Sequence, residues 1–204
     1  MVIRVSILVC TLLTMSVALA DFLPKTFSSQ FEQNYTSSLK GREKSGKGSI
    51  EYKYPGHIRF ETDAPSTVTF VSNGKKTWYY RAPFIEGEQG EVTESSIAEG
   101  TNIYIKFFDS LNKGLVNNAL YSVKLTNYAE LTFSEKLKGE LSISEANIYF
   151  KDNKIGKFED VEKIELVLTD NKKTTIKFLD LKVNPVISEE KFNFSPPKNT
   201  KIVN

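Results

Sequence analysis

The sequence of 204 residues has little of the chemistry on which most enzyme active sites depend. It contains one cysteine, Cys10, and one histidine, His57. A chain this poor in thiol and imidazole offers neither a cysteine nucleophile nor a histidine-rich metal site. His57 follows Pro55-Gly56 in an expected turn, and we interpret it as an exposed turn residue. A pair of carboxylates stays open as a catalytic device, but nothing singles out one pair. We therefore predict that the protein is not an enzyme and holds no cofactor or metal.

The sequence also lacks blocks of charge of one sign. Lys and Arg total 27 and Asp and Glu total 25, and the two signs are interspersed along the chain. Binding to nucleic acid depends on clustered cations that neutralise phosphates. The charge pattern therefore argues against a nucleic acid partner.

Long apolar runs are missing except at the start of the chain. Arg4 precedes an apolar stretch, Ile7–Leu19, which ends in the small residues of Ala18–Ala20. This stretch is shorter than the roughly 20 residues that span a bilayer, and it has the pattern of a secretory signal. We predict that Met1–Ala20 is cleaved and that Asp21–Asn204 forms a single domain; a retained membrane anchor is the less favoured alternative.

Removal of this segment would leave no cysteine, because Cys10 lies inside it. Val9 precedes Cys10 where a lipidation site would have a small residue, so we do not interpret Cys10 as lipidated. Exported domains often rely on disulfides. This one is expected to be held together by burial alone.

Period-two patterns of apolar residues dominate the rest of the chain. Gly46–Tyr54 and His57–Asp63 each place apolar residues on one face of a strand. Phe27, Phe31, Tyr35 and Leu39 are spaced by four, which suits a strand or a helix equally. The sequence thus favours a mainly β protein.

Asn73-Gly74 is the clearest turn signal, because it separates two β-rich runs and suits a type I′ hairpin. We predict that Ser72 pairs with Lys75, which would place Thr69 opposite Trp78 and Val68 opposite Tyr79. Both faces of this hairpin would then carry large apolar side chains. A sheet covered on both sides, or curled around an internal space, is implied.

One stretch breaks the β pattern. Ile97–Leu111 has apolar residues at helical spacing, with Gly114 placed to end the helix. Strands are expected again over Leu120–Thr126, Ala129–Ser134, Ala146–Lys151, Ile155–Thr169 and Thr174–Val183. The whole chain after the leader is expected to form one antiparallel sheet with a helical insertion.

Four stretches together resemble the outer-membrane lipoprotein carrier family, the LolA-type periplasmic chaperones. They resemble family patterns of the forms GxLxxxRP with FxW, VSDGKxxWxY, PFVE and FxFxPP. In this sequence they are Gly48–Pro55 with Ile58–Phe60, Val71–Lys75 with Trp78–Tyr80, Pro83–Glu86 and Lys191–Pro197. Each pattern is weak alone, but their order and spacing are specific, and the resemblance extends over essentially the whole chain after the leader.

The resemblance implies an unclosed antiparallel β-barrel (α+β) with a helical lid over a hydrophobic cavity. It also implies a monomeric periplasmic chaperone that takes acylated lipoproteins from an inner-membrane ABC-type releasing complex. The cargo would pass to an outer-membrane lipoprotein receptor, where one is present. An acyl-chain-binding sensor domain of an envelope-stress system is the alternative, since it would share the fold and the cavity.

The sequence departs from the family at two places. Tyr54 replaces the arginine that the family associates with the lid, and a tyrosine hydroxyl is not a charged five-donor group. Only Asp21–Thr26 remains for an N-terminal helix. We therefore expect a smaller lid, formed mainly by Ile97–Leu111, with Tyr54 as a lid-associated residue.

The large apolar side chains of the strands and the helix are candidates for the cavity lining. For each of them an ordinary core position is an equal alternative, and the sequence leaves open which face of the hairpin is concave. The candidates are Phe31, Ile50, Tyr52, Ile58, Phe60, Phe70, Trp78, Tyr80, Phe84, Ile103 and Phe107.

Overall fold

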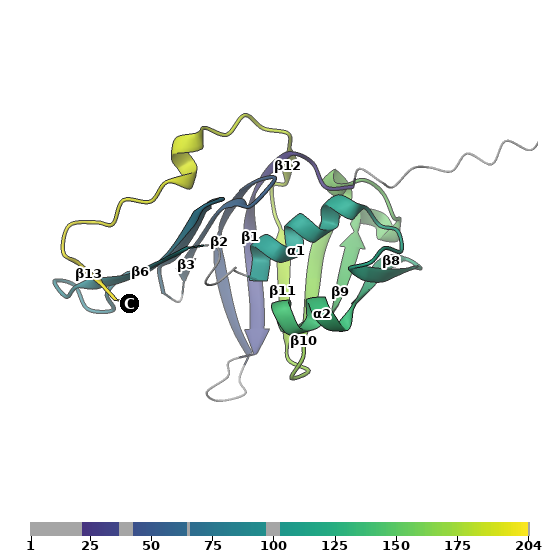
Figure 1. Ribbon diagram of the computed structural model, residues 1–204, viewed down its shortest axis with the longest axis horizontal. Coiled ribbons are helices and arrows are strands. Elements are labelled where there is room, and N and C mark those ends of the chain that lie inside the picture. The colour runs from purple at the N-terminus through teal and green to yellow at the C-terminus, as the bar shows by residue number, and fades with distance from the viewer. Residues whose placement is uncertain (1–21, 37–42, 65, 97–102, 204) are drawn as a thin grey trace, which may run out of the picture.

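The fold is built on one long, curved sheet, shown in Figure 1. The computed structural model describes residues 22–36, 43–64, 66–96 and 103–203. Thirteen strands of these residues form the sheet, in the order β13-β6-β5-β4-β3-β2-β1-β11-β10-β9-β8-β7, and β12 also pairs with β1. The strands are β1 (Thr26–Thr36), β2 (Glu43–Lys53), β3 (His57–Ala64), β4 (Val68–Asn73), β5 (Lys76–Arg81), β6 (Gly90–Ser96), β7 (Tyr121–Leu125), β8 (Tyr128–Phe133), β9 (Ile143–Phe150), β10 (Val161–Leu168), β11 (Lys173–Phe178), β12 (Lys182–Val183) and β13 (Thr200–Ile202). The predicted unclosed sheet is confirmed, because β13 and β7 lie at opposite ends of this order.

Strand β1 joins the two halves of the sheet. It pairs with β2 along its whole length, and on its other side it pairs with β11 and β12. The alternative of a helix over Phe27–Leu39 is therefore excluded as far as Thr36. Leu39 lies outside the described residues, as do the predicted signal segment and Cys10.

Two short helices cover the concave face. Figure 1 shows α1 (Ile103–Ser110) and α2 (Glu135–Leu141) crossing in front of the strands from β1 to β8, while β3 to β6 extend beyond α1. A 3-10 turn, η2 (Leu111–Lys113), continues α1. The helix predicted over Ile97–Leu111 is present from Ile103 onward, and residues 97–102 lie outside the described part of the chain.

Helix α2 was not predicted from the sequence. Ser134, assigned there to the end of a strand, is its N-cap, and the Ser134 hydroxyl accepts a hydrogen bond from the Leu137 amide. Serine at this position satisfies an amide that has no partner inside the helix. The predicted strand Ile155–Thr169 is also shorter in the structure, because the 3-10 turn η4 (Phe158–Asp160) precedes β10.

The register predicted for the β4–β5 hairpin is wrong, because each residue of β4 pairs with a residue of β5 two positions later than predicted. Ser72 pairs with Thr77, Phe70 with Tyr79 and Thr69 with Tyr80. The turn residues are Gly74 and Lys75, and of these only Gly74 has a positive φ, of 77°. Glycine at the first central position suits a type II′ turn, whereas type I′ needs positive φ at both. The Asn73 side chain instead accepts hydrogen bonds from the amides of Lys75 and Lys76, at 3.0 and 2.9 Å.

The last part of the chain, residues 184–203, forms a C-terminal strap over the convex face. Figure 1 shows it passing from β12 to the edge of β6. A 3-10 turn, η5 (Glu189–Phe192), inserts the fully buried Phe192 beside His57, with ring centroids 5.4 Å apart. The strap ends in β13, which pairs with β6 in parallel, so the prediction of a purely antiparallel sheet fails at this edge.

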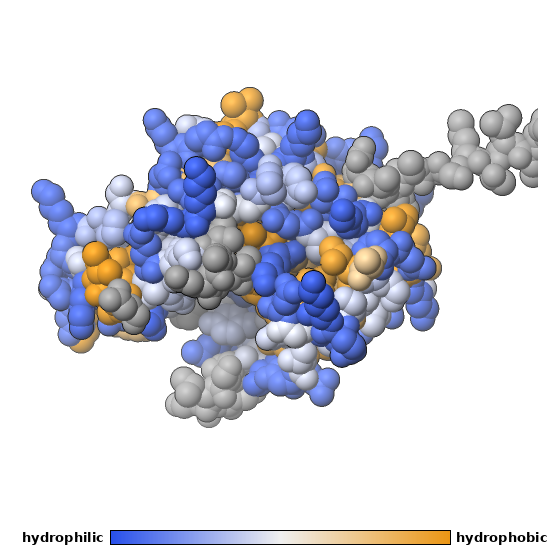
Figure 2. Space-filling view, viewed as in Figure 1, coloured by the Kyte–Doolittle hydropathy of each residue, from blue (hydrophilic) through white to orange (hydrophobic). Residues whose placement is uncertain are grey.

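The face of the molecule in Figure 2 is mainly hydrophilic, with apolar residues in small separate patches. No helix among the described residues is both long enough and apolar enough to cross a membrane. The main hydrophobic core lies between the concave face and the helices. A second apolar group, consisting of Val71, Tyr80, Val92 and Phe192, is buried outside that core, at the strap.

Candidate ligand cavity

A cavity of about 360 Å³ opens where α1 begins, at the end of the sheet where β1, β3 and β5 finish. The described strands β1 to β5, the start of α1 and the β10–β11 hairpin contribute its walls. Its lining residues are Gln33, Tyr35, Thr36, Gly46, Phe60, Thr62, Ser66, Val68, Phe70, Tyr79, Tyr104, Leu168 and Thr174.

Three neighbouring strands form the apolar wall of the cavity. Phe60 of β3 pairs with Phe70 of β4, which pairs with Tyr79 of β5, so the three side chains lie in one row across the sheet. Side chains directly opposite each other on paired strands project to the same face. The row therefore presents a continuous aromatic surface toward the cavity.

Tyr104 of α1 covers the Phe60 end of this surface. Its ring stacks on Phe60 at 4.9 Å with an interplanar angle of 11°, and Phe60 stacks in turn on Phe31 at 4.6 Å. The Gln33 amide donates a 3.0 Å hydrogen bond to the Tyr104 hydroxyl. Burial raises the pKa of Tyr104 to about 12, although the bond from Gln33 acts in the opposite direction. The tyrosine is therefore neutral at physiological pH.

The other end of α1 is held by a carboxylate. Tyr52 donates a 2.5 Å hydrogen bond to Oδ1 of Asp109, and the Gly56 amide donates to the same oxygen at 3.1 Å. Burial raises the pKa of Tyr52 far above its usual range, and the charge of Asp109 adds to the effect. Phe107, Phe108 and Leu111 are almost wholly buried beside this contact. The C-terminal end of α1 is thus fixed by both packing and hydrogen bonds.

Tyr54 also contacts this end of the lid. Its hydroxyl accepts a 3.3 Å hydrogen bond from the Asn112 side-chain amide, in the turn η2 that follows α1. Tyr54 is exposed, so this contact is weaker than the buried contact of Asp109. The contact agrees with a lid-associated position, but Tyr52 and Asp109 carry the stronger connection.

The predicted lining residues divide into three groups. Phe60 and Phe70 line the cavity. Phe31, Ile50, Tyr52, Ile58 and Phe107 are fully or almost fully buried in the core beneath it, and Ile103 packs on that core at the start of α1.

The remaining three lie away from the cavity. Trp78 and Tyr80 flank Tyr79 in β5, so that they project from the opposite face of the sheet. The Trp78 indole donates to Glu94 at 3.0 Å, and the Tyr80 ring lies 5.6 Å from Phe194 of the strap. Phe84 is 87% exposed in the loop between β5 and β6.

Sequence reasoning missed Tyr79 and Tyr104, which complete the apolar surface. Tyr79 pairs with Phe70, and the predicted register already placed it on the same face, opposite Val68, but the predicted lining instead included its neighbours Trp78 and Tyr80. Tyr104 could not be found, since its contact with Phe60 depends on how α1 crosses the sheet.

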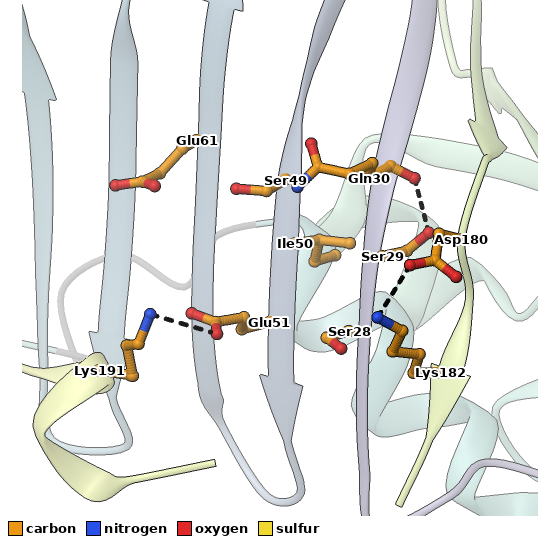
Figure 3. A pocket seen from close by; sticks show the side chains of 10 residues that line it. All are labelled: Ser28, Ser29, Gln30, Ser49, Ile50, Glu51, Glu61, Asp180, Lys182 and Lys191. Carbon is orange, nitrogen blue, oxygen red and sulfur yellow. Dashed lines mark hydrogen bonds and ion pairs between the residues drawn. The ribbon is translucent and has the colours of Figure 1, made fainter. Parts of the chain in front are cut away.

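A second hollow, of about 270 Å³, has a different character. Figure 3 shows polar and charged side chains from β1, β2 and β3 beside Asp180, Lys182 and Lys191. Lys191 pairs with Glu51 at 3.5 Å and Lys182 with Asp180 at 2.9 Å. Its charges are already paired, and it offers no apolar surface comparable to the aromatic row. Within the described residues, no three His, Cys, Asp or Glu side chains form a metal-binding group.

Comparison with known proteins gives consistent matches. Residues 24–195 match the family model described as "Outer membrane lipoprotein carrier protein LolA". The chain is 30% identical over 192 residues to the outer-membrane lipoprotein carrier protein of Pseudoalteromonas translucida, covering 92% of this chain and 86% of that protein. It is 28% identical over 182 residues to the protein of the same name from Francisella philomiragia, covering 87% and 82%. The crystal structure of a LolA superfamily protein from Nitrosomonas europaea covers 86% of this chain and 93% of its own, with 10% identity and a TM-score of 0.44.

Proposed function

This chain belongs to the outer membrane lipoprotein carrier protein family LolA, and from that membership we propose that it carries acylated lipoproteins between membranes. In this proposal it binds the acyl chains of lipoproteins released from the inner membrane and transfers them to the outer membrane. It acts in the periplasm as a monomer, after cleavage of Met1–Ala20, and it catalyses no reaction.

The observation that carries the proposal is the aromatic surface of Phe60, Phe70, Tyr79 and Tyr104 around a cavity. Each acyl methylene removed from water contributes about 0.8 kcal/mol. An exposed acyl chain therefore needs an apolar shelter during transit. A lining that offers mainly dispersion contacts also lets the chain go, because no polar recognition has to be broken on release.

The volume of the cavity supports a lid that moves. At about 360 Å³ it lies near the lower limit of small-ligand sites, which span roughly 300–1,000 Å³. A lipoprotein with three acyl chains needs more space than this. Displacement of α1 would uncover further apolar surface, including Phe27 and Tyr52, which pack against Phe108 of the helix in this form.

The partners proposed are an inner-membrane ABC-type releasing complex and, where one is present, an outer-membrane lipoprotein receptor. Transfer between them requires that the carrier binds acyl chains less tightly than the accepting membrane does.

Adjacent residues of β5 provide a test with a matched control. Tyr79→Asp places a charge on the cavity wall at a residue that is 43% exposed, so the fold should tolerate it. Because an unpaired charge is costly in an apolar site, we expect affinity for a tripalmitoylated lipopeptide to fall at least tenfold. Trp78→Asp makes the same chemical change on the opposite face and should leave affinity within about twofold. Fluorescence titration of the purified mature chain measures both.

Equal loss in both variants, or no loss in either, would reject the cavity as the acyl site. A transfer assay from inner-membrane to outer-membrane vesicles addresses the second half of the proposal. Tight lipopeptide binding without any transfer would favour the sensor function instead.

A further inference from the structure

Strand β6 presents an edge that is only partly occupied. The Gly90 amide donates to the Asn199 carbonyl at 3.2 Å, and the Val203 amide donates to the Val92 carbonyl at 2.8 Å. The backbone groups of Gly90 and Val92 therefore point away from β5. Because backbone groups alternate in direction along a strand, those of Glu94 and Ser96 point the same way. No described residue pairs with β6 beyond Val92 on this side.

The strand that occupies this edge is poorly anchored. Pairing of β13 with β6 extends over three residues, and Ile202 is 69% exposed. Asn199 adds a 3.1 Å hydrogen bond to the Glu88 carbonyl. Segments with few buried contacts open at low cost in free energy. The family match also ends at residue 195, so β13 lies outside it.

The cavity lies next to this edge. Tyr79 lines the cavity and pairs with Thr93 of β6, while Arg81, at the end of β5, pairs with Glu91. The cavity is thus formed at the end of the sheet where β6 begins. Figure 1 shows β6 and β13 at that side of the molecule, beyond the region covered by α1.

We propose that the edge of β6 binds the extended N-terminal segment of the bound lipoprotein as an added parallel strand, and that β13 occupies the edge until cargo arrives. This inference rests on the proposed carrier function. The direction of β13 supports it, because a parallel segment begins beside Gly90, at the cavity. In a bacterial lipoprotein the acylated cysteine is the first residue, so its polypeptide leaves the cavity at the point where a parallel strand would start.

Recognition through main-chain hydrogen bonds also suits the task. An added strand obtains affinity from its backbone and needs no particular sequence. A carrier can therefore hold the emerging segments of many different lipoproteins. The N-terminal segment of the lipoprotein, next to its acyl chains, would in this way be ordered against the sheet.

The test compares two probes, namely a tripalmitoylated cysteine followed by eight Ser, Ala, Thr and Asn residues, and the same acylated cysteine as an amide without a peptide. Removal of residues 199–204 takes away the resident strand. The peptide-bearing probe should then bind about tenfold more tightly, because a competing strand lowers apparent affinity by the fraction of time that it fills the edge. The peptide-free probe should bind as before.

A second substitution tests whether the backbone hydrogen bonds of β6 hold the added strand. In the truncated chain, Glu94→Pro removes the outward amide at an edge position where proline is tolerated, and it should abolish most of the gain. Glu94→Ala is the control, because it removes the ion pair with Lys76 but keeps the amide. In the full chain, the lipopeptide should slow hydrogen exchange at the Glu94 and Ser96 amides. This measurement does not depend on whether the variants fold.

The inference is overturned if truncation leaves both probes unchanged or strengthens both equally. It is also overturned if the truncated chain forms a dimer in sedimentation, since a second copy would then be the partner of the edge. Failure of the full chain to bind the peptide-free probe would instead reject the carrier function. Normal binding of that probe, without any effect of the peptide, rejects the strand addition alone.

Discussion

Gly48 leaves no room for a side chain between β1 and β3. A Cβ atom at this position would lie 1.9 Å from the Glu61 carbonyl oxygen and 2.8 Å from the Phe31 ring. The carbonyl belongs to the paired strand, so it cannot move without disturbing the register. The glycine that begins the family-like stretch Gly48–Pro55 therefore has a packing reason.

We expect Gly48→Ala to lower the free energy of unfolding by about 1–3 kcal/mol, because overpacking forces backbone shifts. Gly139→Ala is the control: a Cβ atom there meets nothing within 4 Å in α2, and alanine favours the helix by about 1 kcal/mol. Urea unfolding followed by circular dichroism measures both. A Gly48 variant as stable as the parent would show that β3 can yield at this point.

At this scale, the sequence predicted large apolar side chains at alternating strand positions but left open which face of the sheet they occupy. Phe60 and Phe70 follow from alternation within their strands, and both line the cavity. Tyr79 and Tyr80 are adjacent, so they lie on opposite faces of β5, and Tyr79 shares the face of Phe70. The predicted turn on Asn73-Gly74 and the observed turn on Gly74-Lys75 differ by two residues in the pairing and leave this assignment unchanged, so what the sequence could not decide is which face of the hairpin is concave.

Among the elements, α1 is fixed at one end by Asp109 and covers the cavity at the other with Tyr104. The Asp109 carboxylate has two donors, one in β2 and one in the β2–β3 turn, whereas the Lys106–Glu140 ion pair between α1 and α2 lies at the surface. Hydrogen bonds to charged groups contribute about 1.5–3 kcal/mol, but exposed ion pairs contribute about 0–1 kcal/mol. The helix should therefore pivot about its C-terminal end.

We expect Asp109→Ala, and to a smaller extent Tyr52→Phe, to speed hydrogen exchange across α1 by roughly tenfold or more. Lys106→Ala should change it little. Hydrogen exchange followed by mass spectrometry of the α1 peptide tests this ranking. Faster exchange in the Lys106 variant than in the Asp109 variant would place the stronger support at α2.

The elements differ in how well the sequence could predict them. Ile103–Ser110 has a helical stripe of buried residues, so periodicity alone found it. Helix α2 is seven residues long, too short for periodicity to be visible, and its capping serine was read as part of a strand. The pairing of β13 with β6 joins segments more than a hundred residues apart, which no local pattern reports.

At the scale of the whole molecule, buried tyrosines are expected to lower the free energy of unfolding at alkaline pH. Burial raises the pKa of Tyr104 and of Tyr121 to about 12. The Tyr121 hydroxyl donates to the Gly114 carbonyl at 2.7 Å, which joins the end of η2 to β7. In the unfolded chain both groups ionise near pH 10. Their contribution is therefore complete below pH 10 and is lost as the pH rises from 10 through about 12.

We expect the free energy of unfolding to be level between pH 7 and 9 with respect to these groups and to fall steeply above pH 10. The Tyr104→Phe/Tyr121→Phe variant should be less stable at pH 8 but should lose less between pH 10 and 11.5. Urea unfolding at each pH provides the comparison. Parallel pH profiles for the parent and the variant would assign the alkaline loss to other groups.

The central place of β1 has a consequence for how the protein acquires its structure. As synthesis runs from the N-terminus, β1 and β2 are available first, but residues 173–183, which complete the other side of β1, come about 140 positions later. Until then β1 is an open edge with unpaired backbone groups. An incomplete chain is accordingly the state most exposed to aggregation, and a holding chaperone would be needed most before the last thirty residues are made.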